Sequence, residues 1–377
     1  MSPQKQSPQK RIAIFISYSG QGGVERMVAS LAGGMVAAGY SVDMLLIKAK
    51  GEHVDTIPTG VRVIKLKAQH TLTSLPELVR YLRQQQPSAL LAAKHRAMKV
   101  AVVARWLAGT KTRLVGRLGT TVSAALAGQS WLRKVLWYSS MRFYYRWVDC
   151  IIAVSEGVAE DVRRIANVPP RRVRVVRNPV ITPSLVARAA DPVDHPWFQA
   201  GERIPVILGA GRFTRQKDFD TLIRAFARLH AQRPCRLMIL GEGKLRPQLE
   251  ALVAELGLQA DVALPGFASN PYAAMSKVQL FVLSSRWEGS PNVLTEAMAL
   301  GVPVVSTDCP SGPVEILQHG QYGKLVTMGD VEGLAQAMAE TLDHPLPAAQ
   351  LQAAVSEYHI ETSTRGYLDA LGLPNNE

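Results

Sequence analysis

Apolar and polar positions follow two alternating patterns along the chain. Runs of four to eight mostly apolar residues are separated by longer stretches with the composition of helices. Such an alternation predicts the buried strands of parallel sheets that helices cover on both faces. The first set of runs comprises 12–17, 42–47, 61–66, 89–94, 113–118, 150–155 and 173–178, and the second comprises 204–211, 236–243, 262–267, 280–285, 303–307 and 324–327. Two successive sets predict an α/β protein with two doubly wound, Rossmann-like domains.

The boundary between the two sets is predicted after residue 178. The stretch that follows, 181–203, is rich in proline and has no clear periodicity, as a linker would. Ligands of open α/β sheets bind beyond the carboxyl ends of the strands. Two such domains that face each other are therefore expected to place a site in the cleft between them.

The most informative stretch is 280–317, which reads as strand, polar loop, helix, strand and a second loop. Glu288 on the first loop and Glu296 about a turn into the helix are eight positions apart. The helix start between them offers free N–H groups and a positive dipole end. This layout suits a phosphate flanked by hydroxyl-rich groups, as in a nucleotide-sugar. Paired carboxylates also occur in glycoside hydrolases, but those enzymes need no basic phosphate loop beside the acids.

Such a basic loop opens the second set. Gly209 and Gly211 permit a tight turn, whereas Thr214 stands where a dinucleotide fingerprint needs its third glycine. Arg212 and Lys217 lie on the same loop, and a diphosphate needs two compensating charges. We interpret these two residues as diphosphate ligands.

Asp218 and Asp220 resemble the Asp-x-Asp pair that holds a divalent metal in some sugar transferases. Asp220 directly precedes a helical stretch, so we predict that it is the N-cap of that helix. No metal site is predicted.

Charge is distributed unevenly. Residues 1–180 carry a net charge of +19 and residues 181–377 one of −6. The first half is expected to meet an anionic membrane, a lipid-linked phosphate or nucleic acid. A nucleic-acid binder would show base-stacking aromatics on a known module, and none is found. No apolar run approaches the roughly 18 to 20 residues of a membrane span, and three scattered cysteines favour a reducing compartment without disulfides.

One basic segment, 131–148, also contains seven aromatic residues. As a helix it would be partly amphipathic, with rings of the kind that favour a bilayer interface. The alternative is an ordinary core helix before the next strand.

At this point a resemblance becomes specific. Residues 286–305 resemble the Glu-x7-Glu signature of retaining glycosyltransferase family 4, whose two Rossmann-like domains form the GT-B fold. The match covers most of 204–327 and is looser in the first half. It implies an acceptor-binding domain at 1–178, to which a C-terminal helix at 360–374 returns, and a nucleotide-sugar-binding domain at 179–359.

The resemblance also implies roles for individual residues. Glu288 would contact the donor sugar, Glu296 the ribose hydroxyls, and Arg212 and Lys217 the diphosphate. The remaining implied ligands are Gly289 and the N–H groups of Asn292, Val293 and Leu294 for sugar and distal phosphate, Gly22 and Gly23 for a loop that closes over the donor, and Phe267 beside the base.

In one place the chain departs from its relatives. Many of them carry a histidine in the loop after the strand equivalent to 113–118, where this chain reads Gly119-Thr120-Thr121. The nearest candidate is His95, for which a surface or structural role is the alternative.

Together these features predict a retaining, metal-independent glycosyltransferase without cofactor or protein nucleophile. The expected donor is a UDP-linked hexose or N-acetylhexosamine, and the expected acceptor is a lipid-linked carrier or glycan of polysaccharide, lipopolysaccharide or glycoprotein assembly. We expect a cytoplasmic protein in peripheral contact with the anionic inner face of the membrane. The alternatives are a UDP-sugar epimerase or phosphorylase on the same scaffold, or a basic nucleic-acid-binding protein.

Overall fold

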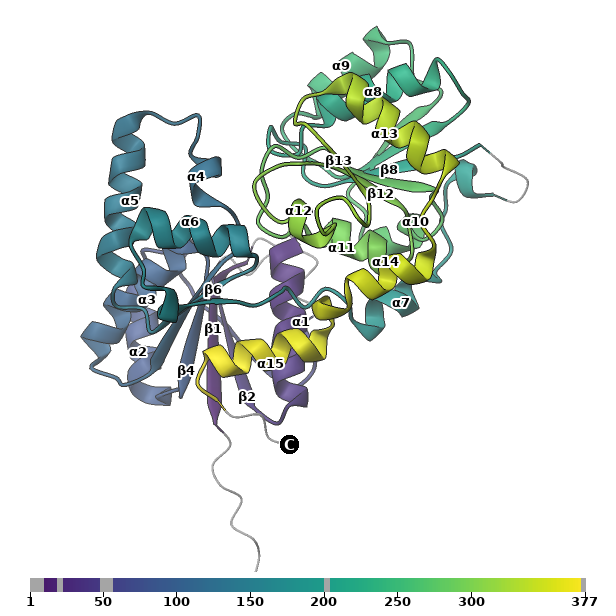
Figure 1. The fold of residues 1–377 in the computed structure, drawn as a ribbon. Helices are drawn as coiled ribbons and strands as arrows, with labels where there is room; N and C mark the ends of the chain where they lie inside the picture. Colours follow the sequence, from purple (N-terminus) through teal and green to yellow (C-terminus); the bar gives the residue numbers. More distant parts are fainter. Residues whose placement is uncertain (1–9, 19–22, 48–56, 200–203, 374–377) are drawn as a thin grey trace, which may run out of the picture. The chain divides into compact units, whose positions relative to one another are not determined.

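The computed structural model describes residues 10–18, 23–47, 57–199 and 204–373. The chain divides into two compact units, the first formed by Met1–Pro179 with Ile360–Glu377 and the second by Val180–His359. All thirteen apolar runs are strands (Figure 1). The two α/β domains with parallel sheets are thus confirmed.

The first unit contains one seven-stranded parallel sheet in the order β3-β2-β1-β4-β5-β6-β7. Its strands are β1 Arg11–Ser17, β2 Ser41–Ile47, β3 Val61–Lys65, β4 Ala89–Ala93, β5 Arg113–Leu118, β6 Cys150–Ala153 and β7 Val173–Val175. Its helices are α1 Gly23–Ala37, α2 Leu75–Gln85, α3 His95–Ala108, α4 Val122–Ala125, α5 Trp131–Tyr145, α6 Glu156–Ala166, η1 Pro170–Arg172 and α15 Ile360–Ala370.

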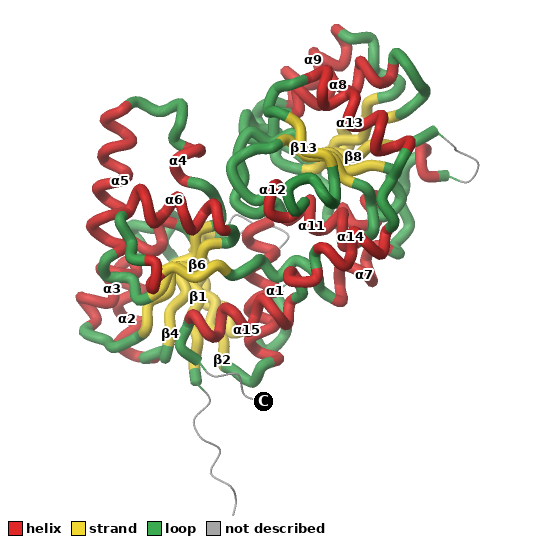
Figure 2. The backbone as a smooth tube through the Cα atoms, in the orientation of Figure 1, coloured by secondary structure: helices red, strands yellow, loops and turns green. Residues whose placement is uncertain are grey.

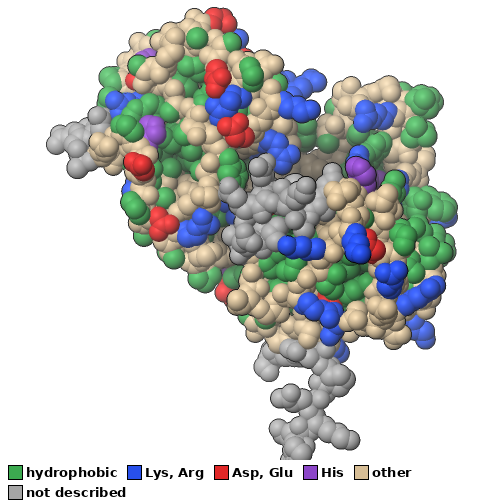
Figure 3. Space-filling model, turned by 180° about the vertical axis from the view of Figure 1, so that it is seen from behind, with side chains coloured by type: hydrophobic (Ala, Val, Ile, Leu, Met, Phe, Trp, Pro, Cys, Tyr) green, Lys and Arg blue, Asp and Glu red, His purple; other side chains and the backbone are tan. Residues whose placement is uncertain are grey.

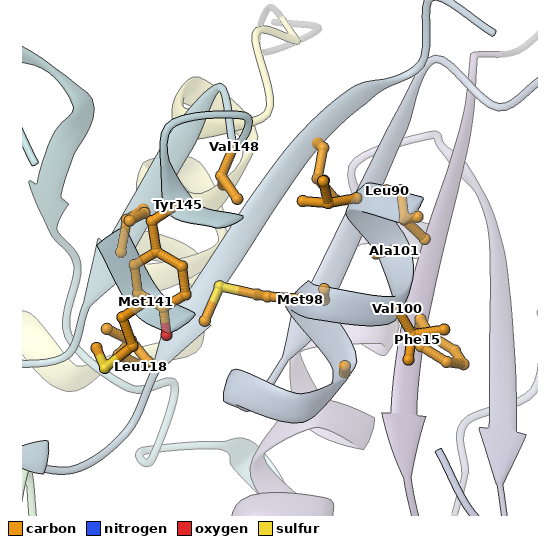
Figure 4. Close-up of a cluster of buried hydrophobic side chains, with 14 of the residues drawn as sticks. Phe15, Leu90, Met98, Val100, Ala101, Leu118, Met141, Tyr145 and Val148 are labelled. Carbon is orange, nitrogen blue, oxygen red and sulfur yellow. The ribbon is translucent and has the colours of Figure 1, made fainter. Parts of the chain in front are cut away.

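Helices cover both faces of this sheet, because its strands are apolar on both sides. Figure 2 shows α2, α3, α5 and α6 on one face and α1 with α15 on the other. The first face buries Phe15, Met98 and Tyr145 in one cluster (Figure 4). A Cβ on Gly116 of β5 would stand 1.9 Å from the sulfur of Met98, so any larger residue at this strand position would force the Met98 side chain of α3 to move.

The second unit repeats the arrangement with six parallel strands in the order β10-β9-β8-β11-β12-β13. Its strands are β8 Val206–Ala210, β9 Arg236–Leu240, β10 Val262–Gly266, β11 Leu280–Leu283, β12 Val304–Thr307 and β13 Lys324–Val326. Its helices are α7 Pro183–Ala189, η2 Pro196–Phe198, α8 Phe219–His230, α9 Arg246–Glu255, α10 Pro271–Met275, α11 Asn292–Ala299, α12 Pro313–Ile316, α13 Val331–Asp343, α14 Ala348–Ala354 and η3 Ser356–Tyr358.

Two local details differ from the sequence-based expectations. The stretch after residue 180 is not a plain linker, because Thr182 caps α7 by accepting a hydrogen bond from the N–H of Leu185 at 3.2 Å. The C-terminal helix, expected at 360–374, spans Ile360–Ala370 and so ends earlier. It packs in the first unit, where the Tyr367 hydroxyl accepts a hydrogen bond from Nε of buried Arg117 at 2.9 Å.

Candidate active site

The two key loops of the second unit follow adjacent strands. The strand order reverses between β8 and β11, which pair directly. Beyond the carboxyl end of β8 lie Arg212 and Lys217, and beyond that of β11 lies Glu288. The reversal point of an open sheet is where such folds leave a crevice for ligands. The topology therefore brings together residues that are more than 70 positions apart.

Glu288 is the centre of this arrangement. One oxygen of its carboxylate, Oε1, lies 2.5 Å from Nζ of Lys217 and accepts a hydrogen bond from the Ser285 hydroxyl at 2.8 Å. Its backbone N–H donates to the carbonyl of Pro310 at 2.7 Å. The side chains of Glu288 and Lys217 are only 10% and 16% exposed. A mostly buried ion pair is thus held from three sides.

The β8–α8 and β11–α11 loops are also bonded to each other along their backbones. The N–H of Arg286 donates to the carbonyl of Gln216 at 2.8 Å, and the Gln216 side chain donates to the carbonyl of Trp287 at 2.9 Å. The hydroxyl of Ser284 donates to the carbonyl of Lys217 at 2.8 Å. These bonds fix the ammonium and the carboxylate relative to each other.

Two glycines allow neighbouring loops beside the site to approach each other closely. A Cβ on Gly241, which follows β9 with φ +151°, would stand 1.8 Å from the carbonyl oxygen of Gly211. A Cβ on Gly312 would stand 2.6 Å from the carbonyl oxygen of Gly289. Gly241 and Gly312 therefore serve close approach of backbone to backbone, a function that does not require a ligand.

The second glutamate lies on α11, as predicted. Glu296 is 3% exposed, and its Oε1 accepts a hydrogen bond from the Tyr272 hydroxyl of α10 at 3.2 Å. Asn292 and Val293 form the first turn of the helix. The N–H of Leu294, however, donates to the carbonyl of Pro291 at 3.0 Å, which corrects its expected role as a free phosphate donor.

Arg212 and Phe267 are both exposed. Arg212 follows β8, and within the part of the chain that the structure describes its guanidinium has no ion pair. Phe267 follows β10 and exposes 39% of its surface. Both side chains therefore remain accessible to a ligand.

The two aspartates of the β8–α8 connection have structural roles. The prediction of Asp220 as N-cap is wrong, because α8 begins at Phe219 and Asp218 occupies the N-cap position, where its side chain makes no capping hydrogen bond. Asp218 accepts a hydrogen bond from the Thr221 hydroxyl at 2.9 Å and pairs with Arg286 at 3.0 Å. Asp220 pairs with Arg224 one turn along the helix. Among the described residues no group of three His, Cys, Asp or Glu side chains is suited to hold a metal ion.

In the first unit the predicted glycine loop is only partly described. Gly22 lies outside the described residues, and Gly23 is the first residue of α1. Two residues on, Glu25 is buried and pairs with Lys94 at 3.4 Å. This pair links the start of α1 to the end of β4.

His95 is the first residue of α3 and contacts α5. Its Nδ1 lies 2.7 Å from the Tyr145 hydroxyl, and its ring lies 4.8 Å from that of Trp137. Burial, with the nearby charges of Lys99 and Arg96, lowers the pKa of His95 to about 4. A neutral imidazole in such contacts holds two helices together, which favours the structural alternative.

Sequence reasoning missed three supporting residues. Ser285 and Gln216 hold the loops that carry Glu288 and Lys217, and Tyr272 contacts Glu296 from 24 positions away. A hydroxyl three residues before Glu288 was the only local signal. The contacts of Gln216 and Tyr272 arise from packing between segments far apart in the sequence, so no residue spacing could have predicted them.

Comparison with known proteins identifies the family. The family described as glycosyl transferases group 1 matches residues 204–344, and the glycosyl transferase 4-like domain matches 22–179. The lipopolysaccharide core biosynthesis glycosyltransferase LpsE of Rhizobium meliloti is 33% identical over 62% of this chain and 67% of its own. The chain belongs to the group 1 glycosyltransferases. The epimerase, phosphorylase and nucleic-acid alternatives are accordingly not favoured.

Another relative of this glycosyltransferase matches nearly the full length. The N-acetylgalactosamine-N,N'-diacetylbacillosaminyl-diphospho-undecaprenol 4-alpha-N-acetylgalactosaminyltransferase of Campylobacter jejuni is 29% identical over 89% of this chain and 90% of its own. Among solved structures, Anabaena HepE in complex with UDP and glucose has a TM-score of 0.75 at 20% identity, covering 97% of this chain and 100% of the other. The outer core galactosyltransferase WaaB has a TM-score of 0.71 at 19% identity, covering 97% and 99%. These likenesses establish the GT-B fold.

Proposed function

We propose that this glycosyltransferase moves a hexosyl or N-acetylhexosaminyl unit from a UDP-sugar to a lipid-linked or glycan acceptor, with retention of configuration. The observation that carries the proposal is the buried Lys217–Glu288 pair at the reversal point of the second sheet. A carboxylate fixed in this way accepts hydrogen bonds from sugar hydroxyls. The ammonium beside it, together with exposed Arg212, suits the diphosphate of the donor.

The proposed chemistry is electrostatic. A nucleoside diphosphate leaves readily only if its growing negative charge is stabilised, and in this proposal Lys217, Arg212 and the start of α11 would supply the positive potential. Glu296 would bind the ribose hydroxyls, Gly289 with the first turn of α11 the sugar and distal phosphate, and Phe267 would lie beside the base. No metal, other cofactor or protein nucleophile is part of this proposal.

The nature of the relatives supports the donor and acceptor classes. The solved structures of HepE contain UDP, and the Campylobacter relative is named for a diphospho-undecaprenol substrate. We infer a cytoplasmic location with peripheral contact at the inner face of the membrane, where a lipid-linked acceptor would be reached. The described helices include none with the length and hydropathy to cross a bilayer.

Transfer from a panel of UDP-sugars to lipid-linked acceptors tests the assignment. Glu288→Gln and Glu296→Gln should each reduce transfer strongly while the fold persists, and Glu332→Gln, a change on an exposed surface pair, is the matched control. Full activity of both site variants would disprove the site. NMR of the product should show a retained anomeric configuration, and EDTA should leave the rate unchanged. An inverted product or a strict metal requirement would refute those parts of the proposal.

A further inference from the structure

The helix α5 has an outward face that no part of the described chain covers. Of its fifteen residues only Met141 and Tyr145 are buried, and both point into the core cluster (Figure 4). On the opposite side Leu132, Leu136 and Phe143 are exposed, Leu136 to 62%. Their spacing of four and seven residues places them on one side of the helix. A surface helix with apolar residues on both its inner and its outer side needs a second partner.

The apolar surface extends beyond α5 itself. Trp147 follows the helix and contacts Trp106 of α3 edge-to-face, with ring centroids 5.1 Å apart. Eight of the twelve exposed large hydrophobic side chains of the described residues belong to residues 131–147 and to the end of α3, so these two neighbouring segments expose most of the large apolar side chains. We call this surface the α5 face, and it consists of Trp106, Leu107, Trp131, Leu132, Val135, Leu136, Phe143 and Trp147.

The charged residues of the segment that contains α5 have one sign. Between residues 119 and 148 there are four basic residues and no acid. Arg133, Lys134, Arg142 and Arg146 each donate a hydrogen bond to a neutral oxygen, and no carboxylate of the described residues pairs with them. Figure 3, which shows the molecule from behind, has hydrophobic and basic side chains together along the edge where α5 lies.

These charges decide between the candidate partners. A second copy of this chain on a two-fold axis would bring Arg133 and Arg146 against their counterparts, with no acid between residues 119 and 148 to offset them, which disfavours a dimer. Tryptophan at both ends, aliphatic residues between them and basic side chains alongside match the interface of a bilayer with anionic headgroups. The stack of the Arg146 guanidinium 4.5 Å from the centre of the Phe143 ring shows that cation and ring already share one surface.

We propose that the α5 face lies in the headgroup region of an anionic bilayer, with α5 parallel to the membrane plane. Its fifteen residues extend about 22 Å along the surface. The inference deepens the proposed function, on which it rests, because the membrane is where a lipid-linked acceptor is presented. His95 and Tyr145, by joining α3 to α5, would hold the face in position.

Sedimentation with phosphatidylcholine vesicles, with and without phosphatidylglycerol, tests the proposal. The native protein should bind the anionic vesicles more tightly and lose part of that affinity at high salt. Leu132→Ser with Leu136→Ser should weaken binding at least tenfold, since two side chains no longer insert. Arg133→Gln with Arg146→Gln should weaken it about fivefold for each charge removed. Val186→Ser and Lys277→Gln, at exposed positions outside the face, are the matched controls and should change nothing.

Hydrolysis of the UDP-sugar, or transfer to a water-soluble acceptor analogue, separates this inference from the proposed function. The α5-face variants should keep that activity and lose transfer only to acceptors embedded in vesicles. Unchanged vesicle binding in both double variants would overturn the inference while leaving the donor site untouched. A dimer in solution that the Leu132→Ser and Leu136→Ser changes dissociate would also overturn it, because the face would then be an interface between copies.

Discussion

The Lys217–Glu288 pair offers a direct test of how the site is built. Replacing Lys217 by Met leaves a carboxylate that is nine-tenths buried beside a neutral side chain, and replacing Glu288 by Gln does the same for the ammonium. Breaking a fully buried pair costs about 3–5 kcal/mol. The residual exposure here reduces this cost to roughly 2–3 kcal/mol for each single variant. A domain with a typical stability of about 5–15 kcal/mol should still fold.

Comparing the double variant with the two single variants measures the interaction free energy between Lys217 and Glu288, apart from the contribution of each side chain alone. If the two charges stabilise each other, the double variant should be less destabilised than the sum of the single variants, by about 1.5–3 kcal/mol in urea unfolding. The exposed pair Lys324–Glu340 of the same unit, 2.8 Å apart, should show no measurable coupling when treated alike. If the effects of the single variants simply added in both pairs, Lys217 and Glu288 would not stabilise each other, and the account of a buried, coupled ion pair would be refuted.

Activity gives the second readout. Loss of one charge that stabilises the leaving group should reduce kcat by about 10²–10³. Lys217→Met should do so, whereas Glu288→Gln should reduce transfer for a different reason, because its carboxylate no longer accepts hydrogen bonds from the donor sugar. The double variant should be no worse than the more impaired single variant. Native kcat in Lys217→Met would mean that this ammonium does not act on the diphosphate.

Three further predictions concern the scaffold. Gly241→Ala should destabilise the second unit by about 2–4 kcal/mol in urea unfolding, because its Cβ would overlap a carbonyl oxygen of the next loop, whereas Gly257→Ala, with open space around it, should cost about 1 kcal/mol; equal effects would contradict this. Arg117→Met should cost about 2–3 kcal/mol and speed hydrogen exchange in α15, and Tyr367→Phe, which removes one hydrogen bond, about 1 kcal/mol; unchanged exchange would show that this bond does not hold the helix. His95 has a pKa of about 4 when folded against 6.5 ordinarily, so the unfolded chain binds the additional proton and stability is lost as pH falls from 6.5 towards 4. His95→Gln should remove about 2–3 kcal/mol of that loss between pH 7 and about pH 4.5, and an identical pH dependence in both proteins would refute it.

Several features of the molecule follow from local sequence alone. The apolar runs that became strands are short and bounded by glycine, proline or polar residues, so each strand could be placed without knowledge of its neighbours. The spacing of Glu288 and Glu296 placed one on a loop and the other on α11. Helix starts were less predictable, since α8 begins at Phe219, one residue before Asp220, which the sequence suggested as its cap.

Tertiary structure decided what these residues touch. Lys217 meets Glu288 only because β8 and β11 pair at the reversal of the sheet, a contact across 71 positions that no local pattern encodes. The burial of His95 against Tyr145, and the exposure of Leu136, depend on which side of α5 packs on the core. Sequence determined the elements and the chemical types, because propensity and periodicity act over a few residues. Pairing, burial and charge environment act between distant segments, and only the folded chain brings those together.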